Sequence, residues 1–244
     1  MSKVAPLGKR LWKRPAYLEG ARLRYHDLVA IIDDEALVLD HHPFRDRHLI
    51  LAVLSRHHGV QRGVLRRARG GKAPPAAAAQ ILSRIQVSLY QKANAELATF
   101  RHIDLLTSSF PLASDLARSP AAAVVAELLL TFCPPGEPDD RSYRLGVSCL
   151  DALLEGKEPD TIVSYAEFWI LALGGVLPSA DTITTALGGK GQAFLAICRR
   201  QPVLEAPSAV PREVVGWLDQ RVREEAERPM RALSFYRDLG GWSP

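Results

Sequence analysis

The sequence has few cysteines and no long apolar segment. No apolar run approaches the roughly 20 residues that a membrane-spanning helix needs. The first 15 residues are basic, but the apolar segment of a secretory signal does not follow them. The cysteines are odd in number and widely spaced, so we expect buried free thiols and no disulfide framework: Cys133, Cys149 and Cys198. These absences predict a cytoplasmic protein that does not contact a membrane.

The sequence also lacks the short motifs that mark common catalytic sites. Ser55, Ser83 and Ser88 are not part of the G-x-S-x-G turn that exposes a nucleophilic serine. The glycine-rich residues 188–191 do not have the G-x-x-x-x-G-K-[ST] spacing of a phosphate-binding loop. We therefore expect that the protein is not an enzyme.

Two pairs of histidines, His41-His42 and His57-His58, raise the question of a metal site. Neighbouring residues on a strand point to opposite faces, so each pair offers one ligand to either side. We find no nearby cysteine or carboxylate that completes a ligand set. We interpret these residues as turn or surface histidines and predict that the protein holds no metal.

Positive charge is concentrated in the first third of the chain. Residues 45–72 contain eight arginines and lysines and a single acidic residue, Asp46. Residues 1–26 carry a net charge of +6, residues 27–44 carry −5, and the chain from residue 73 onward carries −4. The plain alternative is a solvated basic face, but the uneven distribution favours binding. A compact basic face is typical of a protein that holds a phosphate backbone.

Residues 35–105 form short apolar runs typical of β-strands. Ile85, Val87 and Leu89 alternate with polar residues, which is the clearest period of two in the chain. Four or five short strands at this spacing, separated by glycine and proline, predict a small β-barrel. The strand-like segments are 35–39, 48–54, 60–69, 85–90 and 97–105, and residues 70–75 read as an exposed loop.

Beyond residue 110 the apolar pattern becomes helical, and prolines and glycines mark the helix ends. The pattern predicts five or six helices, so the chain is expected to be an α+β protein with an N-terminal barrel and an all-α bundle. The expected helices cover 121–132, a segment from Asp139 or Asp140 to Gly156, Pro159 to Gly174, a segment that ends at Arg200 after a break at 188–191, and Pro211 to Arg228.

The basic strands and their aromatic neighbours predict a nucleic-acid site. Arginine pairs with phosphate oxygens through two parallel hydrogen bonds, and small barrels stack bases on aromatic rings. We assign Phe44 and Phe100 to the core and Tyr90, which is out of phase with the apolar positions of its strand, to the surface. Alternation along a strand places Arg67 and Arg69 on the side opposite Arg66. The candidate site residues are Arg45, Arg47, Arg56, Arg62, Arg66, Arg67, Arg69, Lys72 and Tyr90.

Five segments, in their order and spacing, resemble the RecO family of bacterial recombination mediators. They are residues 43–54, His58-Gly59, residues 66–70, residues 174–178 and the closing residues 228–235. The closing segment has the pattern R-P-[LM]-[KR]-[AS]-L-x-F, which is the most specific of the five. The resemblance spans residues 35–239. It implies a five-stranded OB-fold in residues 31–108 and a helical domain in residues 109–244.

The chain departs from the pattern of that family at two places. Many members carry paired C-x-x-C motifs after the segment that corresponds to residues 174–178, and these cysteines form a structural zinc site. Residues 179–197 contain no cysteine, so we predict a variant whose insertion near 178–192 holds no zinc, and no other cofactor. The basic residues 1–30 are an extension, either a DNA-binding arm, a partner contact or the product of an upstream start codon that the cell does not use.

The resemblance also implies partners. It implies binding of single- and double-stranded DNA, strand annealing, and contacts with RecR, in some organisms with RecF, and with the C-terminal tail of the single-strand binding protein. It further implies an indirect role in loading RecA and a location at the nucleoid. An RNA-binding or ribosome-associated barrel protein and a protein–protein adaptor remain alternatives. An acidic, apolar-ended tail suits a groove flanked by arginines of the helical domain, and the candidates are Arg118, Arg141, Arg144, Arg199 and Arg200.

Overall fold

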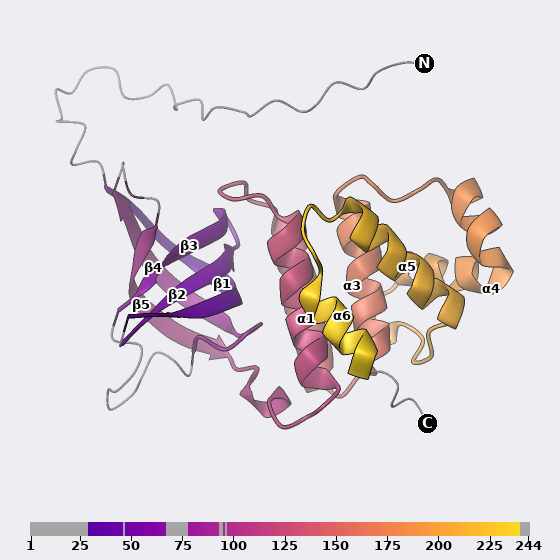
Figure 1. Cartoon of the computed structure of the whole chain (residues 1–244), viewed down its shortest axis with the longest axis horizontal. Coiled ribbons are helices and arrows are strands. Elements are labelled where there is room, and N and C mark those ends of the chain that lie inside the picture. Colours follow the sequence, from indigo (N-terminus) through magenta and orange to yellow (C-terminus); the bar gives the residue numbers. More distant parts are fainter. Residues whose placement is uncertain (1–28, 46, 67–77, 93–94, 96, 240–244) are drawn as a thin grey trace, which may run out of the picture.

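The N-terminal part of the chain is a closed five-stranded barrel. The structure, a computed structural model, describes residues 29–239 apart from residues 46, 67–77, 93–94 and 96. The strand order is β1-β2-β3-β5-β4, with β3 and β5 parallel and the other pairs antiparallel (Figure 1). The predicted OB-fold is confirmed. Its strands are β1 (Val29–Phe44), β2 (His48–Ser55), β3 (Gly59–Leu65), β4 (Arg84–Lys92) and β5 (Ala98–Thr107).

Strand β1 is longer than the apolar residues 35–39 that predict it. Its first half pairs with β4 and its second half with β2, and a register shift between Val38 and Asp40 bends the strand between them. The barrel core is built from alternating positions. Ile85 and Phe100 are 0% and 3% exposed, as their places in the alternation predict.

The second part of the chain contains six α-helices among the described residues. The predicted signals mark several of their ends: the Asp139 carboxylate accepts a hydrogen bond from the Arg141 amide, and Pro159 begins a helix. None of the described helices is long and apolar enough to cross a membrane. The helices are α1 (Arg118–Phe132), α2 (Asp140–Leu154), α3 (Pro159–Leu173), α4 (Ala180–Arg200), α5 (Arg212–Glu225) and α6 (Arg231–Leu239), with 3-10 turns η2 (Phe110–Leu112) and η3 (Val203–Glu205).

The predicted helix from Pro211 to Arg228 is too long, because α5 ends at Glu225. A proline disfavours the helical conformation of the residue before it, and Arg228 precedes Pro229. Arg228 instead reaches α1, where its guanidinium donates to the Thr131 hydroxyl at 3.0 Å and 3.1 Å. The chain thus leaves α5 to begin α6 against α1.

The closing segment that resembles the RecO pattern packs on α1. Met230 and Leu233 are buried at 2% and 0% exposure. The Glu127 carboxylate accepts hydrogen bonds from the Arg231 amide at 2.7 Å and the Leu233 amide at 3.1 Å. A carboxylate near the first amides of a helix stabilises them. The segment therefore fixes the last helix to the bundle.

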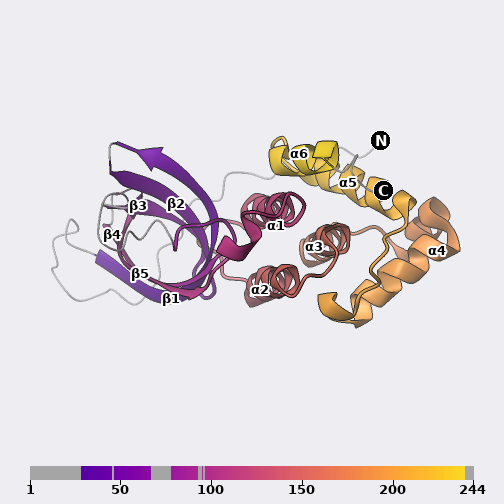
Figure 2. The ribbon, with the colours of Figure 1, turned by 90° about the horizontal axis from the view of Figure 1, so that it is seen from below.

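The barrel joins the bundle through β1 and β2. Figure 2 shows α1 and α2 next to the barrel, α3 on their side away from the barrel, and α4 at the far end of the molecule. Leu37 of β1 is fully buried within the core of the helical part. A Cβ at Gly146 of α2 would lie 2.5 Å from Leu37 Cδ1, so the glycine permits this close contact. Barrel residues at this joint thus belong to the core of the helical part, while the interior of the barrel forms a separate core.

Candidate nucleic-acid interface

The turn between β1 and β2 presents a cation stacked on an aromatic ring. Arg45 adopts a left-handed backbone conformation with φ of 54°, which reverses the chain. Its guanidinium carbon lies 5.2 Å from the centre of the Phe44 ring, within the range of a cation–π contact. Phe44 is half-buried, so the predicted core assignment holds only in part. Arg47 is exposed on the same turn.

A row of paired residues crosses the outer face of the barrel. Ile50 of β2 pairs with Val64 of β3, and Val64 pairs with Thr99 of β5. Thr99 pairs with Tyr90 of β4, which in turn pairs with Ile31 of β1. Adjacent paired residues on one face lie within contact distance. The row is partly exposed along its length and Ile31 is 59% exposed, so the outer face carries apolar and aromatic surface.

Two adjoining hollows flank this row. Phe44, Arg45, His48 and Val64 line the first, together with Arg66 and Thr99. The second contains Tyr90, Arg101 and His102 and shares Arg66 and Thr99 with the first. Arg66 is exposed at the end of β3, between the two. The arrangement provides three guanidinium groups and two partly exposed aromatic rings, Phe44 and Tyr90, along one groove, a chemistry that suits phosphates and bases.

Glycine at position 63 brings the two walls of this groove together. A Cβ at Gly63 would lie 2.8 Å from the Ala98 carbonyl oxygen and 3.0 Å from the Phe100 ring. No side chain fits there without moving the backbone of β5. The close approach of β3 to β5 places Arg66 and Arg101 beside the same hollow.

Arg101 is a candidate that the sequence reasoning missed. Leu89 pairs with Phe100 while Ser88 pairs with His102, so Arg101 is the extra residue of a β-bulge. Its guanidinium carbon lies 5.9 Å from the centre of the Tyr90 ring. The bulge cannot be read from the sequence. The only available signal was an arginine within a predicted strand near a surface tyrosine.

The structure brings some of the predicted residues together and separates others. Arg45, Arg66 and Tyr90 line the groove, while Arg47 and Arg62 are exposed on the barrel but do not line either hollow. Three further predicted residues lie in 67–77, outside the described residues: Arg67, Arg69 and Lys72.

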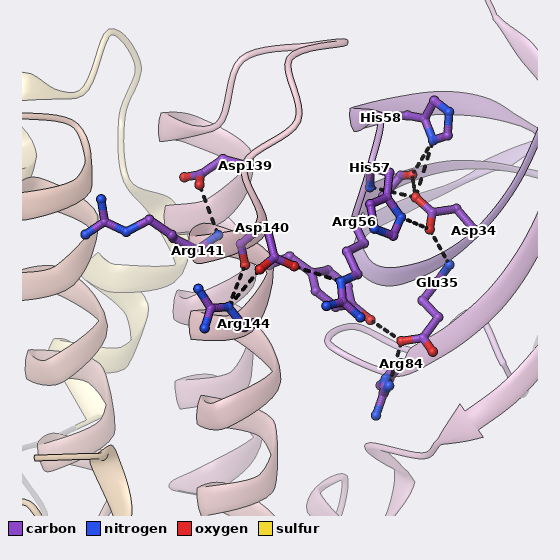
Figure 3. Close-up of polar contacts among 12 residues, drawn as sticks. Asp34, Glu35, Arg56, His57, His58, Arg84, Asp139, Asp140, Arg141 and Arg144 are labelled. Carbon is purple, nitrogen blue, oxygen red and sulfur yellow. Dashed lines mark hydrogen bonds and ion pairs between the residues drawn. The ribbon is translucent and has the colours of Figure 1, made fainter.

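Arg56 lies elsewhere, at the joint with the helices (Figure 3). Its Nε donates to Asp140 Oδ1 of α2 at 2.7 Å, and its guanidinium lies 5.8 Å from the Tyr143 ring centre. The hydrogen bond from Arg56 lowers the pKa of the Asp140 carboxyl. The side chain of Arg56 therefore makes its contacts between barrel and bundle. This position does not support the prediction that Arg56 binds phosphate.

A second ion pair lies at the same joint. The Arg84 guanidinium donates to the Glu35 carboxylate at 2.6 Å, and the Tyr143 hydroxyl donates to it at 3.2 Å. The hydrogen bond from Arg84 is the main cause that lowers the pKa of Glu35. These contacts hold the acidic segment of β1 against α2.

The histidine pair 57–58 has a carboxylate partner that the sequence reasoning did not find. His57 Nδ1 lies 2.8 Å and His58 Nδ1 3.3 Å from the buried Asp34 carboxylate, to which Ser55 also donates. Burial acts to raise the pKa of Asp34, but the hydrogen bonds from Ser55 and His57 outweigh it and the pKa is lowered. The Ser55 side chain is fully buried, and these contacts hold the β2–β3 turn against Asp34 of β1.

Comparison with known proteins decides the family. The model of the recombination protein O N-terminal domain matches residues 29–109, and that of its C-terminal domain matches residues 113–182. The chain belongs to the RecO family. The groove therefore lies on the OB-fold barrel of a RecO-family chain.

Three relatives, each called DNA repair protein RecO, show how far the similarity extends. The protein of Koribacter versatilis is 28% identical over 144 residues, 59% of this chain and 59% of the relative. That of Symbiobacterium thermophilum is 26% identical over 152 residues, 62% of this chain and 59% of the relative. These two matches span about three fifths of the relatives' length. The protein of Geobacter metallireducens is 24% identical over 237 residues, covering 84% of this chain and 96% of the relative.

The helical part of this RecO-family chain has a hollow of its own between α2 and α3. Arg141, Arg144, Tyr165, Trp169 and Leu173 line it. The Trp169 indole donates to the Cys198 carbonyl at 3.1 Å, which fixes the ring. The predicted arginines Arg118, Arg199 and Arg200 do not line this hollow.

The cysteines lie apart and are buried. Cys133, Cys149 and Cys198 are free, and burial raises their pKa values to about 11, about 12 and about 12. Within the described ranges no group of three or more His, Cys, Asp or Glu residues is arranged to hold a metal ion. A buried thiol that keeps its proton is a poor zinc ligand and a poor nucleophile.

Proposed function

We propose that this protein binds DNA in the groove on the outer face of its barrel and acts in DNA repair as a recombination mediator. The observation that carries the proposal is the position of Arg66 between two adjoining hollows that hold the Phe44–Arg45 and Tyr90–Arg101 pairs. Membership of the RecO family supports it, as do relatives named DNA repair protein RecO.

The chemistry of the groove suits a nucleic-acid backbone with accessible bases. Guanidinium groups neutralise phosphates and release their counterions, which makes affinity depend on salt. The Tyr90 ring and the apolar row beside it offer surface to the faces of unpaired bases. A duplex presents only its backbone to such a face, so single strands gain the additional stacking. Annealing needs two strands held in this way and no bond-making step, so we propose that the protein is not an enzyme and needs no cofactor.

The hollow between α2 and α3 is our proposed site for a protein partner. Arg141 and Arg144 supply positive charge at its rim, and Trp169 and Leu173 supply apolar surface. This chemistry fits the acidic, apolar-ended tail of the single-strand binding protein. The proposal assigns DNA to the barrel and the tail to the helices. RecR, in some organisms RecF, and indirectly RecA complete the set of partners at the nucleoid.

A strand-annealing assay tests the proposal. Two complementary DNA strands, each coated with the single-strand binding protein, are mixed with the full chain, and duplex formation is followed over time. We expect the protein to accelerate annealing, and an excess of structured RNA to compete less well than single-stranded DNA. No acceleration would refute the mediator role, and stronger competition by RNA would favour an RNA-binding protein.

A variant of the hollow between α2 and α3 separates DNA binding from an adaptor role. Arg141→Glu reverses an exposed charge at the rim of the helical hollow. We expect it to weaken binding of the acidic tail peptide while affinity for a single-stranded oligonucleotide is unchanged. An adaptor without a DNA-binding role would show no DNA affinity in either form of the protein.

A further inference from the structure

Asp140, at the start of α2, pairs with one arginine of the barrel and one arginine of the helical hollow. Its Oδ1 accepts a hydrogen bond from Arg56 Nε at 2.7 Å, and its Oδ2 lies 2.9 Å from Arg144 Nε. Arg144 lines the hollow between α2 and α3, whereas Arg56 belongs to the turn that follows β2. Figure 3 shows the carboxylate between the two guanidinium groups. Asp140 therefore links the barrel directly to the proposed site for a protein partner.

The charge that the hollow presents depends on how Asp140 is neutralised. Among the described residues that line the hollow, two are arginines and none is acidic. A carboxylate beside an arginine weakens the attraction of that arginine for a second carboxylate, and it also repels the second carboxylate. The hydrogen bond from Arg56 is the largest cause of the lowered pKa of Asp140, and the charge of Arg144 contributes less. Arg56 is thus the main partner of this carboxylate.

The other carboxylates at the joint have partners of their own. The Glu35 carboxylate accepts a hydrogen bond from Arg84 at 2.6 Å, and the Asp34 carboxylate lies 2.8 Å from His57 Nδ1. Neither of them forms an ion pair with Arg56 within the part of the chain that the structure describes. The charge of Arg56 is therefore directed at the carboxylate that begins α2.

We propose that Arg56 is a positioning residue for the acidic partner of the hollow and that it acts through Asp140. Arg56 neutralises Asp140, so Arg144 keeps its attraction for the carboxylates of the partner. Without Arg56, Asp140 pairs with Arg144 alone and places an uncompensated negative charge beside the incoming acid. The inference rests on the proposed function of the hollow, and it names a barrel residue that makes the hollow select an acidic partner.

The same contacts couple the partner to the barrel. A carboxylate that binds Arg144 competes with Asp140 for this guanidinium, and Asp140 then interacts more strongly with Arg56. Coupling between two sites is reciprocal, so an interaction that Arg56 favours must in turn favour the contact that Arg56 makes. A bound acidic segment is therefore expected to strengthen the joint between barrel and bundle.

The affinity of the full chain for two peptides tests the proposal. The first is a fluorescent peptide of aspartates that ends in Leu-Phe, and the second is its neutral counterpart with asparagines and a terminal amide. Arg56→Ala is expected to bind the acidic peptide about two- to fivefold more weakly, the range that a partly exposed ion pair contributes. Arg56→Lys keeps the charge and is expected to recover most of the affinity. Both variants are expected to bind the neutral peptide as the parent does.

Asp140→Asn separates the effect of charge from an effect on the fold. Once the carboxylate is gone, Arg56 has no charge to neutralise, so the addition of Arg56→Ala is expected to leave the affinity for the acidic peptide unchanged. Arg212→Ala is the matched control, because it removes an exposed arginine at the start of α5 that does not line the hollow. This control is expected to bind both peptides as the parent does.

Three outcomes would overturn the role of Arg56. They are equal affinity of the parent and Arg56→Ala for the acidic peptide, an equal loss for the neutral peptide, and a loss that persists beside Asp140→Asn. A parent chain that does not bind the acidic peptide would instead refute the hollow as the partner site, and the role of Arg56 with it. The first three outcomes leave binding by the parent intact, so failure of this inference is distinguishable from failure of the proposed function.

Discussion

The buried carboxyl of Glu167 is expected to make the stability of this protein fall as pH rises. Glu167 lies on α3, is 0% exposed, and its Oε1 has no hydrogen-bond partner among the described residues. Its Oε2 lies 3.5 Å from Arg237 of α6, and that guanidinium also pairs with Asp160 and Asp219. Burial, and then the charge of Asp219, raise the pKa of Glu167 well above its usual value. The folded chain therefore binds the proton of this carboxyl more tightly than an unfolded chain does.

The sign of the pH dependence follows from proton binding. The folded state binds a proton on Glu167 that an unfolded chain releases above about pH 4.3. The stabilisation is complete below that pH and is lost as pH rises through the higher folded-state pKa. The slope is at most about 1.4 kcal/mol per pH unit, and the free energy of unfolding falls over the interval between the unfolded-state pKa and the higher folded-state pKa. For a chain of this size each kcal/mol that is lost lowers Tm by about 2 to 4 °C.

Glu167→Gln tests this account. Glutamine keeps the shape of the side chain and removes its titration, so we expect a Tm that changes much less over the same pH range. The carboxyls of Asp34, Glu35 and Asp140 do not confuse the result, since their lowered pKa values leave them ionised throughout. Thermal melts of both proteins at several pH values give the comparison, and Glu213→Gln on the exposed face of α5 is the control. Equal slopes for the parent and Glu167→Gln would refute the reasoning.

Three further outcomes are expected. If five or six cations contact phosphates, a plot of the logarithm of affinity for a single strand against the logarithm of salt concentration should have a slope of about −4. A slope near zero in this titration would contradict binding through the basic face. Arg56→Ala should leave that slope unchanged, because its guanidinium binds Asp140 at the joint, whereas a loss like that of Arg66→Ala in the same titration would return Arg56 to the DNA site. The purified protein should contain no stoichiometric zinc and should unfold at the same temperature in a chelator, and elemental analysis showing one zinc per chain would overturn this expectation.

Much of the fold is predictable from local patterns. The alternation of Ile85, Val87 and Leu89 predicts β4 because their strand has one face in the core. Pro159 and Asp139 mark helix starts for reasons that act within a few residues. Gly188, in the predicted break, has φ of 62° and interrupts α4. These features are determined by residues that are near one another in the sequence.

The site is less predictable because its contacts join distant residues. Arg56 reads as one more basic residue of the strands, but it meets Asp140, which lies 84 residues away in sequence. Arg101 reaches the Tyr90 ring only because a β-bulge changes the phase of β5. The acidic start of β1 does not look like a strand, and its Asp34 and Glu35 become intelligible only beside His57 and Arg84. Composition located the basic face but not the residues that share a groove.

The most direct test of the DNA-binding groove is the affinity of Arg66→Glu combined with Arg101→Glu for a labelled single-stranded oligonucleotide, measured by fluorescence anisotropy. The matched control is Arg199→Glu combined with Arg200→Glu, which makes the same change in net charge at the exposed end of α4. We expect the groove variant, folded as judged by circular dichroism, to bind at least about tenfold more weakly, with a salt slope smaller in magnitude by about 1.4. The control is expected to bind as the parent does. Equal affinities for the groove variant and the control would contradict the assignment of DNA to this groove.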